Sequence, residues 1–180
     1  MYGAIIGDII GSRFEFGVND KSKEFDLFTM QDDFTDDTVM SIAVCEALLT
    51  VGKNATIESI ESEVRIQMQK WGNKYPDAGY GSSFINWLKQ GEDAVPYNSF
   101  GNGSAMRVSA AGWLYDSIDR TMEVAGATAN VTHNHEEGIK AAKATAAAIF
   151  MARNNVTKAD IKAYIESEFN YDLSRTLAEI

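Results

Sequence analysis

Apolar residues recur every three or four positions along most of this chain, which is the spacing of one face of an α-helix. The clearest run predicts a helix over residues 55–73, with apolar positions at Ile57, Ile60, Val64, Met68 and Trp71. The same spacing predicts further helices at 38–51, 80–90, 104–118, 120–131, 136–153 and 158–168. No two alternating runs are joined by an Asn-Gly turn, so no hairpin is predicted. We therefore expect an all-α fold, a compact multi-helix bundle.

Two segments are rich in small residues and predict close packing between helices. Gly3, Gly7 and Gly11 lie four apart, so on a helix they form a smooth stripe against which another backbone could pack. The segment AAKATAAAIFMA, residues 141–152, is built in the same way.

Start signals support two of the predicted helices. Asn134 with Glu137, and Thr157 with Asp160, have the spacing of a capping box, although Asp160 is shorter than the usual glutamate. Residues 17–30 form the longest irregular segment of the chain, and such segments often act as lids.

Composition narrows the classes of protein to consider. At 180 residues, the chain is expected to form a single domain over 1–180. Its net charge of −10 argues against unaided nucleic-acid binding, since phosphate attraction needs a basic face. Cys45 is the only cysteine, so no internal disulfide can form. The first residues lack a basic leader and carry Asp8, so we expect neither signal peptide nor membrane span, and a cytoplasmic location.

Four carboxylates, those of Asp32, Asp33, Asp36 and Asp37, immediately precede an apolar run. One interpretation is a helix N-terminus, where Thr35 or Asp36 caps a helix beginning near Thr38 and the acids favour the positive end of its dipole. The other is a divalent cation, because carboxylate and hydroxyl oxygens suit magnesium, manganese or calcium. A calcium-binding EF-hand loop is excluded, since it needs glycine and glutamate where this chain has Thr38 and Val44.

A glycine-rich turn precedes the helical run at 104–118. The backbone amides of Gly101, Asn102, Gly103 and Ser104 could cradle an anion, to which Arg107 could add charge. The competing interpretation is a tight turn in which Ser104 caps the helix.

The only two histidines, His133 and His135, lie two apart just before a predicted helix. They could bind a metal or hydrogen-bond a phosphate or ribose, or they could simply cap and pack the helix junction. Glu15 stands between Phe14 and Phe16, and a carboxylate in apolar surroundings is suited to acid–base chemistry. A solvated loop acid is the alternative.

Taken in order, five motifs resemble the ADP-ribosylglycohydrolase family, the relatives of dinitrogenase reductase-activating glycohydrolase. They are GAIIGDIIGSRFEF at 3–16, FTDDT at 34–38, YGSSF at 80–84 with a following WL, GNGSAMRV at 101–108 and THNHEEGIKAA at 132–142. The resemblance spans residues 1 to about 150.

The resemblance implies an all-α fold with a binuclear magnesium site, for which manganese could substitute, at the base of a cleft that binds ADP-ribose. On the matching positions it implies metal ligation by Thr35, Asp36 and Asp37, and catalytic roles for Asp36 and for Glu15 on a flap. It implies that substrate contacts come from Asn102, Gly103, Ser104, Met106, His133 and His135, with Arg107 supporting the turn.

The implied reaction is magnesium-dependent hydrolysis of the N- or O-glycosidic bond between ADP-ribose and a modified protein side chain or small molecule. One departure matters: the family supplies further metal ligands from a late Asp-x-Asp-Thr or Asp-x-Asp-Ser motif, and no such motif occurs here. The alternative is therefore a catalytically impaired ADP-ribose-binding fragment, C-terminally truncated, with a missing C-terminal fragment or self-association covering its exposed apolar surface. A helical scaffold whose acids are only caps is the third interpretation.

Overall fold

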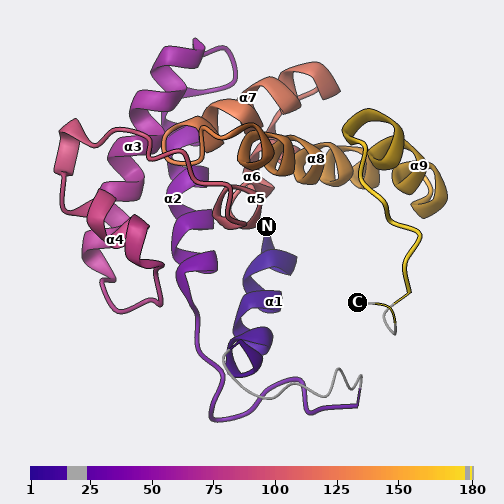
Figure 1. Cartoon of the computed structure of the whole chain (residues 1–180), viewed down its shortest axis with the longest axis horizontal. Coiled ribbons are helices and arrows are strands. Elements are labelled where there is room, and N and C mark those ends of the chain that lie inside the picture. The colour runs from indigo at the N-terminus through magenta and orange to yellow at the C-terminus, as the bar shows by residue number, and fades with distance from the viewer. Residues whose placement is uncertain (16–23, 177–178, 180) are drawn as a thin grey trace.

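The computed structural model describes residues 1–15, 24–176 and 179, and over these it is all-helical, without a strand. This confirms the expected fold class (Figure 1). The α-helices are α1 (Tyr2–Gly11), α2 (Asp36–Val51), α3 (Ile57–Lys74), α4 (Ser82–Leu88), α5 (Gly103–Met106), α6 (Ser109–Leu114), α7 (Ile118–Asn130), α8 (Glu136–Arg153) and α9 (Lys158–Phe169). Two short 3₁₀ helices are η1 (Ser12–Phe14) and η2 (Gly91–Asp93).

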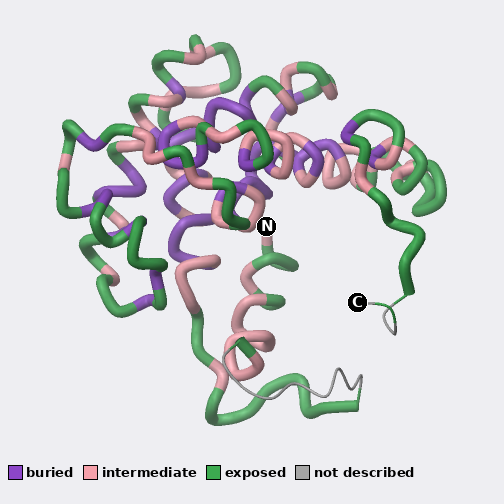
Figure 2. Tube along the Cα trace, viewed as in Figure 1, coloured by how far each residue is buried: buried purple, intermediate pink, exposed green. Residues whose placement is uncertain are grey.

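The core forms around α2, because this helix is apolar on most of its surface. Val39, Ala43, Val44 and Leu48 are all at most 2% exposed. They pack with buried residues of α3, α4, α7 and α8, and Figure 2 shows the buried positions gathered on these helices. A smaller apolar cluster joins α8 to α9. The segment around Asp36 is thus anchored by a helix that is packed into the core.

Small residues allow α6 and α7 to approach α8 closely, as expected for 141–152. Ala142, Ala146 and Ala147 of α8 are fully buried. A Cβ built on Gly112 of α6 would lie 2.6 Å from Cγ2 of Ile149, so no side chain fits at this crossing.

The helix predicted at 104–118 is wrong as a single element. The chain turns at Arg107 and Val108, whose φ and ψ of −97° and −1°, and −82° and −5°, separate α5 from α6. The turn directs the Arg107 side chain into the interior, where it hydrogen-bonds to α7 and to the segment after it. Tertiary hydrogen bonds therefore override the helical pattern here. The helix predicted at 80–90 is also shorter, because α4 covers only Ser82–Leu88.

Of the two predicted capping boxes, one is right. Thr157 accepts from Asp160 N–H at 3.2 Å and caps α9. At α8 the cap is His135 rather than Asn134, whose Oδ1 instead accepts from the backbone N–H of Asn98. Asn134 is wrong as a cap because it joins two loops.

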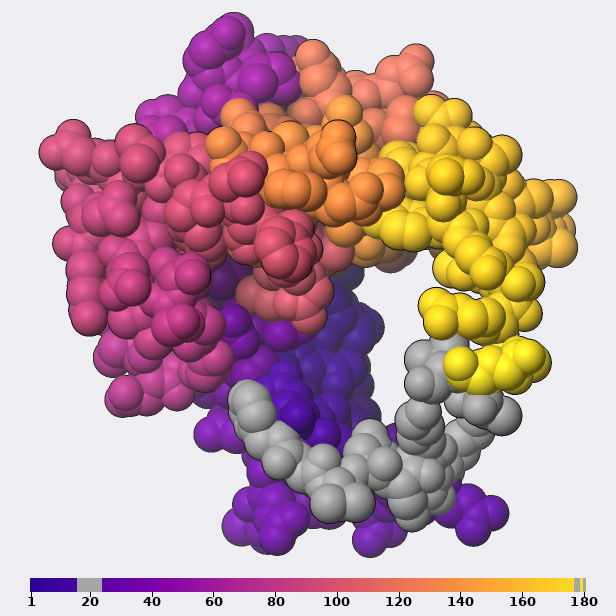
Figure 3. Space-filling model, in the orientation of Figure 1, coloured from indigo at the N-terminus to yellow at the C-terminus, as the bar shows by residue number. Residues whose placement is uncertain are grey.

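The expected close packing on the glycine stripe does not occur among the described residues. A Cβ built on Gly3, Gly7 or Gly11 would meet no atom within 4 Å, and α1 has no buried residue. Helix α1 contacts α2 on one side, and Figure 3 shows a hollow between α1 and the α9 side of the molecule. The stripe therefore faces open space.

The segment expected to act as a lid, 17–30, falls outside the described residues over 17–23, as does Phe16 beside Glu15. Within the part of the chain that the structure describes, no helix combines the length and apolar character needed to cross a membrane.

Candidate functional site

The start of α2 presents two consecutive carboxylates to two different hollows. Thr35 caps the helix, and its Oγ1 accepts from Asp37 N–H at 3.4 Å. Successive helical residues point about 100° apart. Asp36 consequently lines a pocket beside the glycine-rich turn, whereas Asp37 lines a groove along α1. The expected cap at Thr35 is confirmed, and the helix begins at Asp36 rather than near Thr38.

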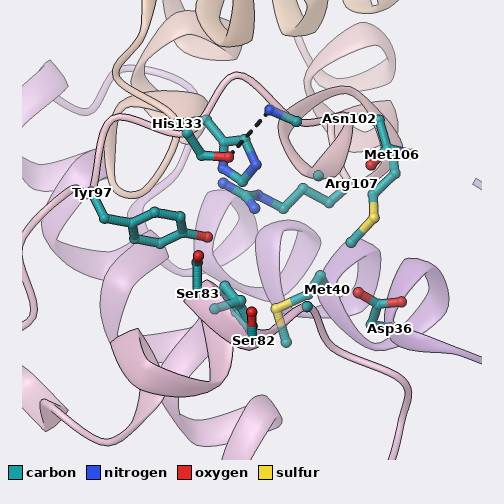
Figure 4. A pocket seen from close by; sticks show the side chains of 14 residues that line it. Asp36, Met40, Ser82, Ser83, Tyr97, Asn102, Met106, Arg107 and His133 are labelled. Atoms are coloured by element: carbon teal, nitrogen blue, oxygen red, sulfur yellow. Dashed lines mark hydrogen bonds between the residues drawn. The ribbon is translucent and has the colours of Figure 1, made fainter.

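The pocket beside Asp36, which we call the turn pocket, has a volume of about 260 Å³. Figure 4 shows Asp36 near one end, and Asn102 and His133 near the other. Ser82 and Ser83, at the start of α4, lie across the pocket from Arg107. Segments distant in sequence therefore build a single hollow with a carboxylate at one end and nitrogen donors at the other.

The glycine-rich turn closes the nitrogen-rich end of this pocket. The N–H of Gly101 donates to Ser99 Oγ at 3.2 Å. Asn102 precedes α5 and makes no side-chain cap bond. A Cβ on Gly103 would lie 3.0 Å from Cε1 and from Nε2 of His133. The absence of a side chain at Gly103 lets the imidazole pack directly on the turn, since a Cβ there would force the ring to shift.

Ser104 does not cap the helix, contrary to one expectation. It is fully buried, and its Oγ donates to the carbonyl oxygen of Gly138 at 2.7 Å. The carbonyl of Met106 accepts from Ser41 Oγ at 3.3 Å. These two bonds fix α5 between α8 and α2, and the Met106 side chain separates the turn pocket from the groove along α1, since it lines both.

Arg107 is a buried cation without a carboxylate partner among the described residues. It is 1% exposed, and Nη2 donates to the carbonyl of Thr128 at 3.2 Å and to Thr132 Oγ1 at 2.7 Å. Burial lowers its pKa to about 10, so the guanidinium stays charged at neutral pH. Its charge lies in the wall of the turn pocket, where it favours an anion.

The structure separates the two histidines. His133 is 5% exposed and lines the turn pocket, and burial lowers its pKa to about 3, with a further contribution from Arg107. His135 is half-buried, and its Nδ1 accepts from the backbone N–H of Glu137 as the cap of α8. Its ring packs edge-on to Phe100. Of the two, only His133 lines the turn pocket.

Three carboxylates meet in the groove along α1. Oxygen atoms of Asp8, Glu15 and Asp37 all lie within 4.8 Å of one another. Asp8 also accepts hydrogen bonds from Thr35 N–H at 2.9 Å, Thr35 Oγ1 at 2.6 Å and Thr38 N–H at 3.1 Å. Asp8 therefore joins α1 to the start of α2.

Burial and the charges of neighbouring acids raise the pKa values of Asp36, Asp37 and Glu15. The pKa of Asp36 rises to about 7, first because of burial and then because of Asp37 and Glu15. Burial and neighbouring acids likewise raise the pKa of Asp37 and of Glu15. Arg13, the nearby base, is paired with Asp32 at 2.8 Å. None of the ion pairs among the described residues involves Asp8, Glu15, Asp36 or Asp37. These four carboxylates, which we call the acidic group, therefore have no cationic side chain as a partner in the part of the chain that the structure describes.

Comparison with known proteins identifies the family to which this chain belongs. The family model described as ADP-ribosylglycohydrolase matches residues 1–180. The chain belongs to the ADP-ribosylglycohydrolase family.

Two relatives in this family are ADP-ribosylhydrolase ARH3 of Xenopus tropicalis and of Homo sapiens. The first is 27% identical over 176 residues, covering 84% of this chain and 49% of the relative. The second is 28% identical over 180 residues, covering 83% and 48%. The chain thus spans about half the length of these curated relatives.

The acidic group of this ADP-ribosylglycohydrolase family member fits a hard divalent cation. Its donors are carboxylate oxygens that repel one another, and among the described residues no base offsets them. Oxygen donors of this kind suit magnesium or manganese. The histidines lie outside the cluster that could hold a metal.

Sequence reasoning did not assign a site role to Asp8 and missed Thr132. The available signal for Asp8 was an acid within an apolar, glycine-rich helix, a position where a charge needs a partner. Thr132 carried no comparable signal, because its role depends on contacts with Arg107 and His133.

Proposed function

We propose that this chain carries the ADP-ribose site of a magnesium-dependent hydrolase that cleaves the N- or O-glycosidic bond between ADP-ribose and a protein side chain or small molecule. The observation that carries the proposal is the polarity of the turn pocket. Asp36 lies at one end, and the turn at Asn102 with His133 and Arg107 lies at the other. ADP-ribose has a matching arrangement, because its terminal ribose carries hydroxyl groups and lies directly beside the anionic diphosphate.

The glycine-rich turn is the proposed diphosphate site. The backbone of Asn102, Gly103 and Ser104 would lie along the phosphate oxygens, with His133 as a side-chain donor and Met106 as part of the wall. The charge of Arg107 favours the anion through the pocket wall. His135 caps α8 through Nδ1, so its proposed substrate contact would come from the remainder of the ring.

The acidic group is the proposed metal site. Thr35, Asp36 and Asp37 are the ligands implied by the family resemblance, and the described structure places Asp8 and Glu15 beside Asp37. Magnesium or manganese, when bound, would orient the ribose hydroxyls and lower the pKa of a water molecule. Asp8 holds the backbone and hydroxyl of Thr35 and so orients this end of the site.

Two carboxylates have proposed catalytic roles. Cleavage at the ribose carbon develops positive charge, which a nearby carboxylate such as Asp36 would stabilise. Glu15 is the proposed group for proton transfer at the scissile bond, and its raised pKa brings it nearer to the pH range where it can exchange a proton.

A second candidate function is ADP-ribose binding without turnover by this chain alone. The observation that favours it is coverage, since the matches span about half the length of the curated relatives. In this case a C-terminal fragment or a second copy would lie over the groove along α1. The cytoplasmic location, the single domain and the absence of nucleic-acid and membrane partners stay predictions.

Calorimetric titration of ADP-ribose into the 180-residue chain, with magnesium and then with chelator, tests the proposal. We expect saturable binding that needs magnesium, and its loss in Asp36→Ala. The matched control is Asp33→Asn, which removes an exposed acid of the same cluster. Binding that survives both chelator and Asp36→Ala contradicts the proposed site. Release of ADP-ribose from a modified protein favours the hydrolase, and binding without release favours the second candidate.

A further inference from the structure

The hydrogen bonds around Arg107 have a fixed direction. A charged guanidinium has only donors. Its Nη2 donates to Thr132 Oγ1 at 2.7 Å, and Thr132 is fully buried. The oxygen of Thr132 is therefore an acceptor, and its single hydroxyl hydrogen is left for another partner.

His133 is the partner of this hydroxyl hydrogen. The Nδ1 atom of His133 lies 2.7 Å from Thr132 Oγ1, and the described residues offer this hydroxyl no other acceptor. If Nδ1 carried the proton, the buried hydroxyl hydrogen of Thr132 would have no acceptor, which is unfavourable. Nδ1 must therefore accept, and the proton of a neutral imidazole lies on Nε2.

The Nε2 atom of His133 lies at the turn pocket. His133 lines this pocket, and Nε2 is 3.0 Å from the point where a Cβ of Gly103 would stand. No described residue forms a hydrogen bond with Nε2, whereas Nδ1 is occupied by Thr132. Figure 4 shows the Arg107 guanidinium beneath the imidazole, on the side away from Asn102. The free N–H is thus at the proposed diphosphate end.

We propose that Arg107 is a positioning residue that acts through Thr132 to hold His133 in its Nε2–H tautomer, ready to donate to an anionic oxygen in the turn pocket. Arg107 uses its hydrogen bond to Thr132 to orient the neutral donor His133, and its positive charge acts on the anion from a distance. Burial, with help from the charge of Arg107, keeps the pKa of His133 low, so the donor is imidazole rather than imidazolium. The identity of the anion as a diphosphate rests on the proposed function, but the tautomer does not.

Nitrogen-15 NMR of histidine-labelled protein tests the tautomer without a ligand. We expect the His133 signals at pH 7 to report a proton on Nε2, with His135→Asn used to assign them because asparagine also caps helices. Thr132→Val should yield a mixture of tautomers, and Thr132→Ser should restore the original signature. Thr128→Val is the matched control. It removes the hydroxyl of another fully buried threonine, in α7, and keeps the backbone carbonyl that accepts a hydrogen bond from Arg107.

Titration of ADP-ribose in the presence of magnesium gives the second readout. We expect Thr132→Val to weaken binding roughly 3- to 10-fold, the usual effect of one hydrogen bond, and Thr128→Val to leave it unchanged. A proton on Nδ1 of His133 in the wild type, or an unchanged signature in Thr132→Val, would overturn the proposal. Failure of wild-type binding would instead contradict the proposed function and leave the NMR result to decide the tautomer.

Discussion

At the scale of residues, the acids around the start of α2 dominate the electrostatics of the site. Asp8 lies in α1, Glu15 directly follows η1, and Asp36 and Asp37 begin α2, and the charges of Asp8, Glu15 and Asp37 each raise the pKa of at least one other acid of this set. Such repulsion destabilises the folded state unless a cation or a proton offsets it. In the absence of a cation, these carboxylates therefore lower the stability of the folded chain.

Neutralising Asp36 should stabilise the metal-free protein at high pH. The folded-state pKa of Asp36 is about 7, above its ordinary value, so the folded protein binds this proton more tightly than the unfolded chain. The stability that comes from protonated Asp36 is fully present below the pKa of this group in the unfolded chain, and it is lost as the pH rises through about 7. In chelator, Asp36→Asn should therefore raise Tm by roughly 3 to 6 °C at pH 8, with the difference shrinking toward pH 4.

Thermal unfolding of both proteins across pH 4–8 provides the measurement. Saturating magnesium should reduce the difference at pH 8, because the ion offsets the same repulsion in the wild type. A difference in Tm that does not change with pH would contradict a pKa of Asp36 raised by burial and by neighbouring acids.

At the scale of elements, glycines have opposite consequences in α1 and α6. In α6, Gly112 lets the helix cross α8 at a distance that admits no side chain. In α1, Gly7 has open space beside it. The same residue type therefore serves packing in one helix and leaves a bare backbone face in the other.

Alanine at these two glycines should change stability with opposite signs. Gly7→Ala should raise the free energy of unfolding by about 0.5–1 kcal/mol, because alanine is the better helix former and nothing obstructs it. Gly112→Ala should lower it by about 1–3 kcal/mol, because the new Cβ would stand 2.6 Å from Ile149 Cγ2 and 3.0 Å from the Ala146 carbonyl oxygen. Urea unfolding of dilute protein measures both; a loss of stability in Gly7→Ala would mean that the stripe is packed in solution.

At the scale of the whole molecule, the core is concentrated on one side and α1 projects from it. The described residues of α1 are all partly or fully exposed, with Tyr2 at 85% and Ile6 at 46%, as Figures 2 and 3 show for the helix as a whole. A helix of this apolar character gains by covering its outer face. The proposed covering is a C-terminal fragment or another copy of the chain.

The 180-residue chain is accordingly expected to self-associate at micromolar concentrations when studied alone. Ile6→Glu should shift it toward the monomer, because a charge on α1 opposes burial of that face. Ile66→Glu is the matched control, since Ile66 lies on α3 with a similar exposure of 48%. Multi-angle light scattering over a concentration series reports the mass, and a monomer at every concentration would contradict this prediction.

The sequence by itself determined the features that depend on neighbours within a few positions. Helical spacing located α2, α3, α7, α8 and α9, because periodicity and capping are local properties. The acidic cluster and the glycine-rich turn were recognised for the same reason, since both lie in continuous segments.

Only the tertiary structure decided the features that depend on distant partners. It broke the run at Arg107, because contacts with Thr128 and Thr132 outweigh continued helix. It brought Asp8 to Thr35, and it placed His133 in the turn pocket while leaving His135 as a cap. Hydrogen bonds and close packing between segments far apart in the chain have no local signature. A pattern of residues therefore indicates candidate site residues, and only the tertiary contacts determine which of them lie together.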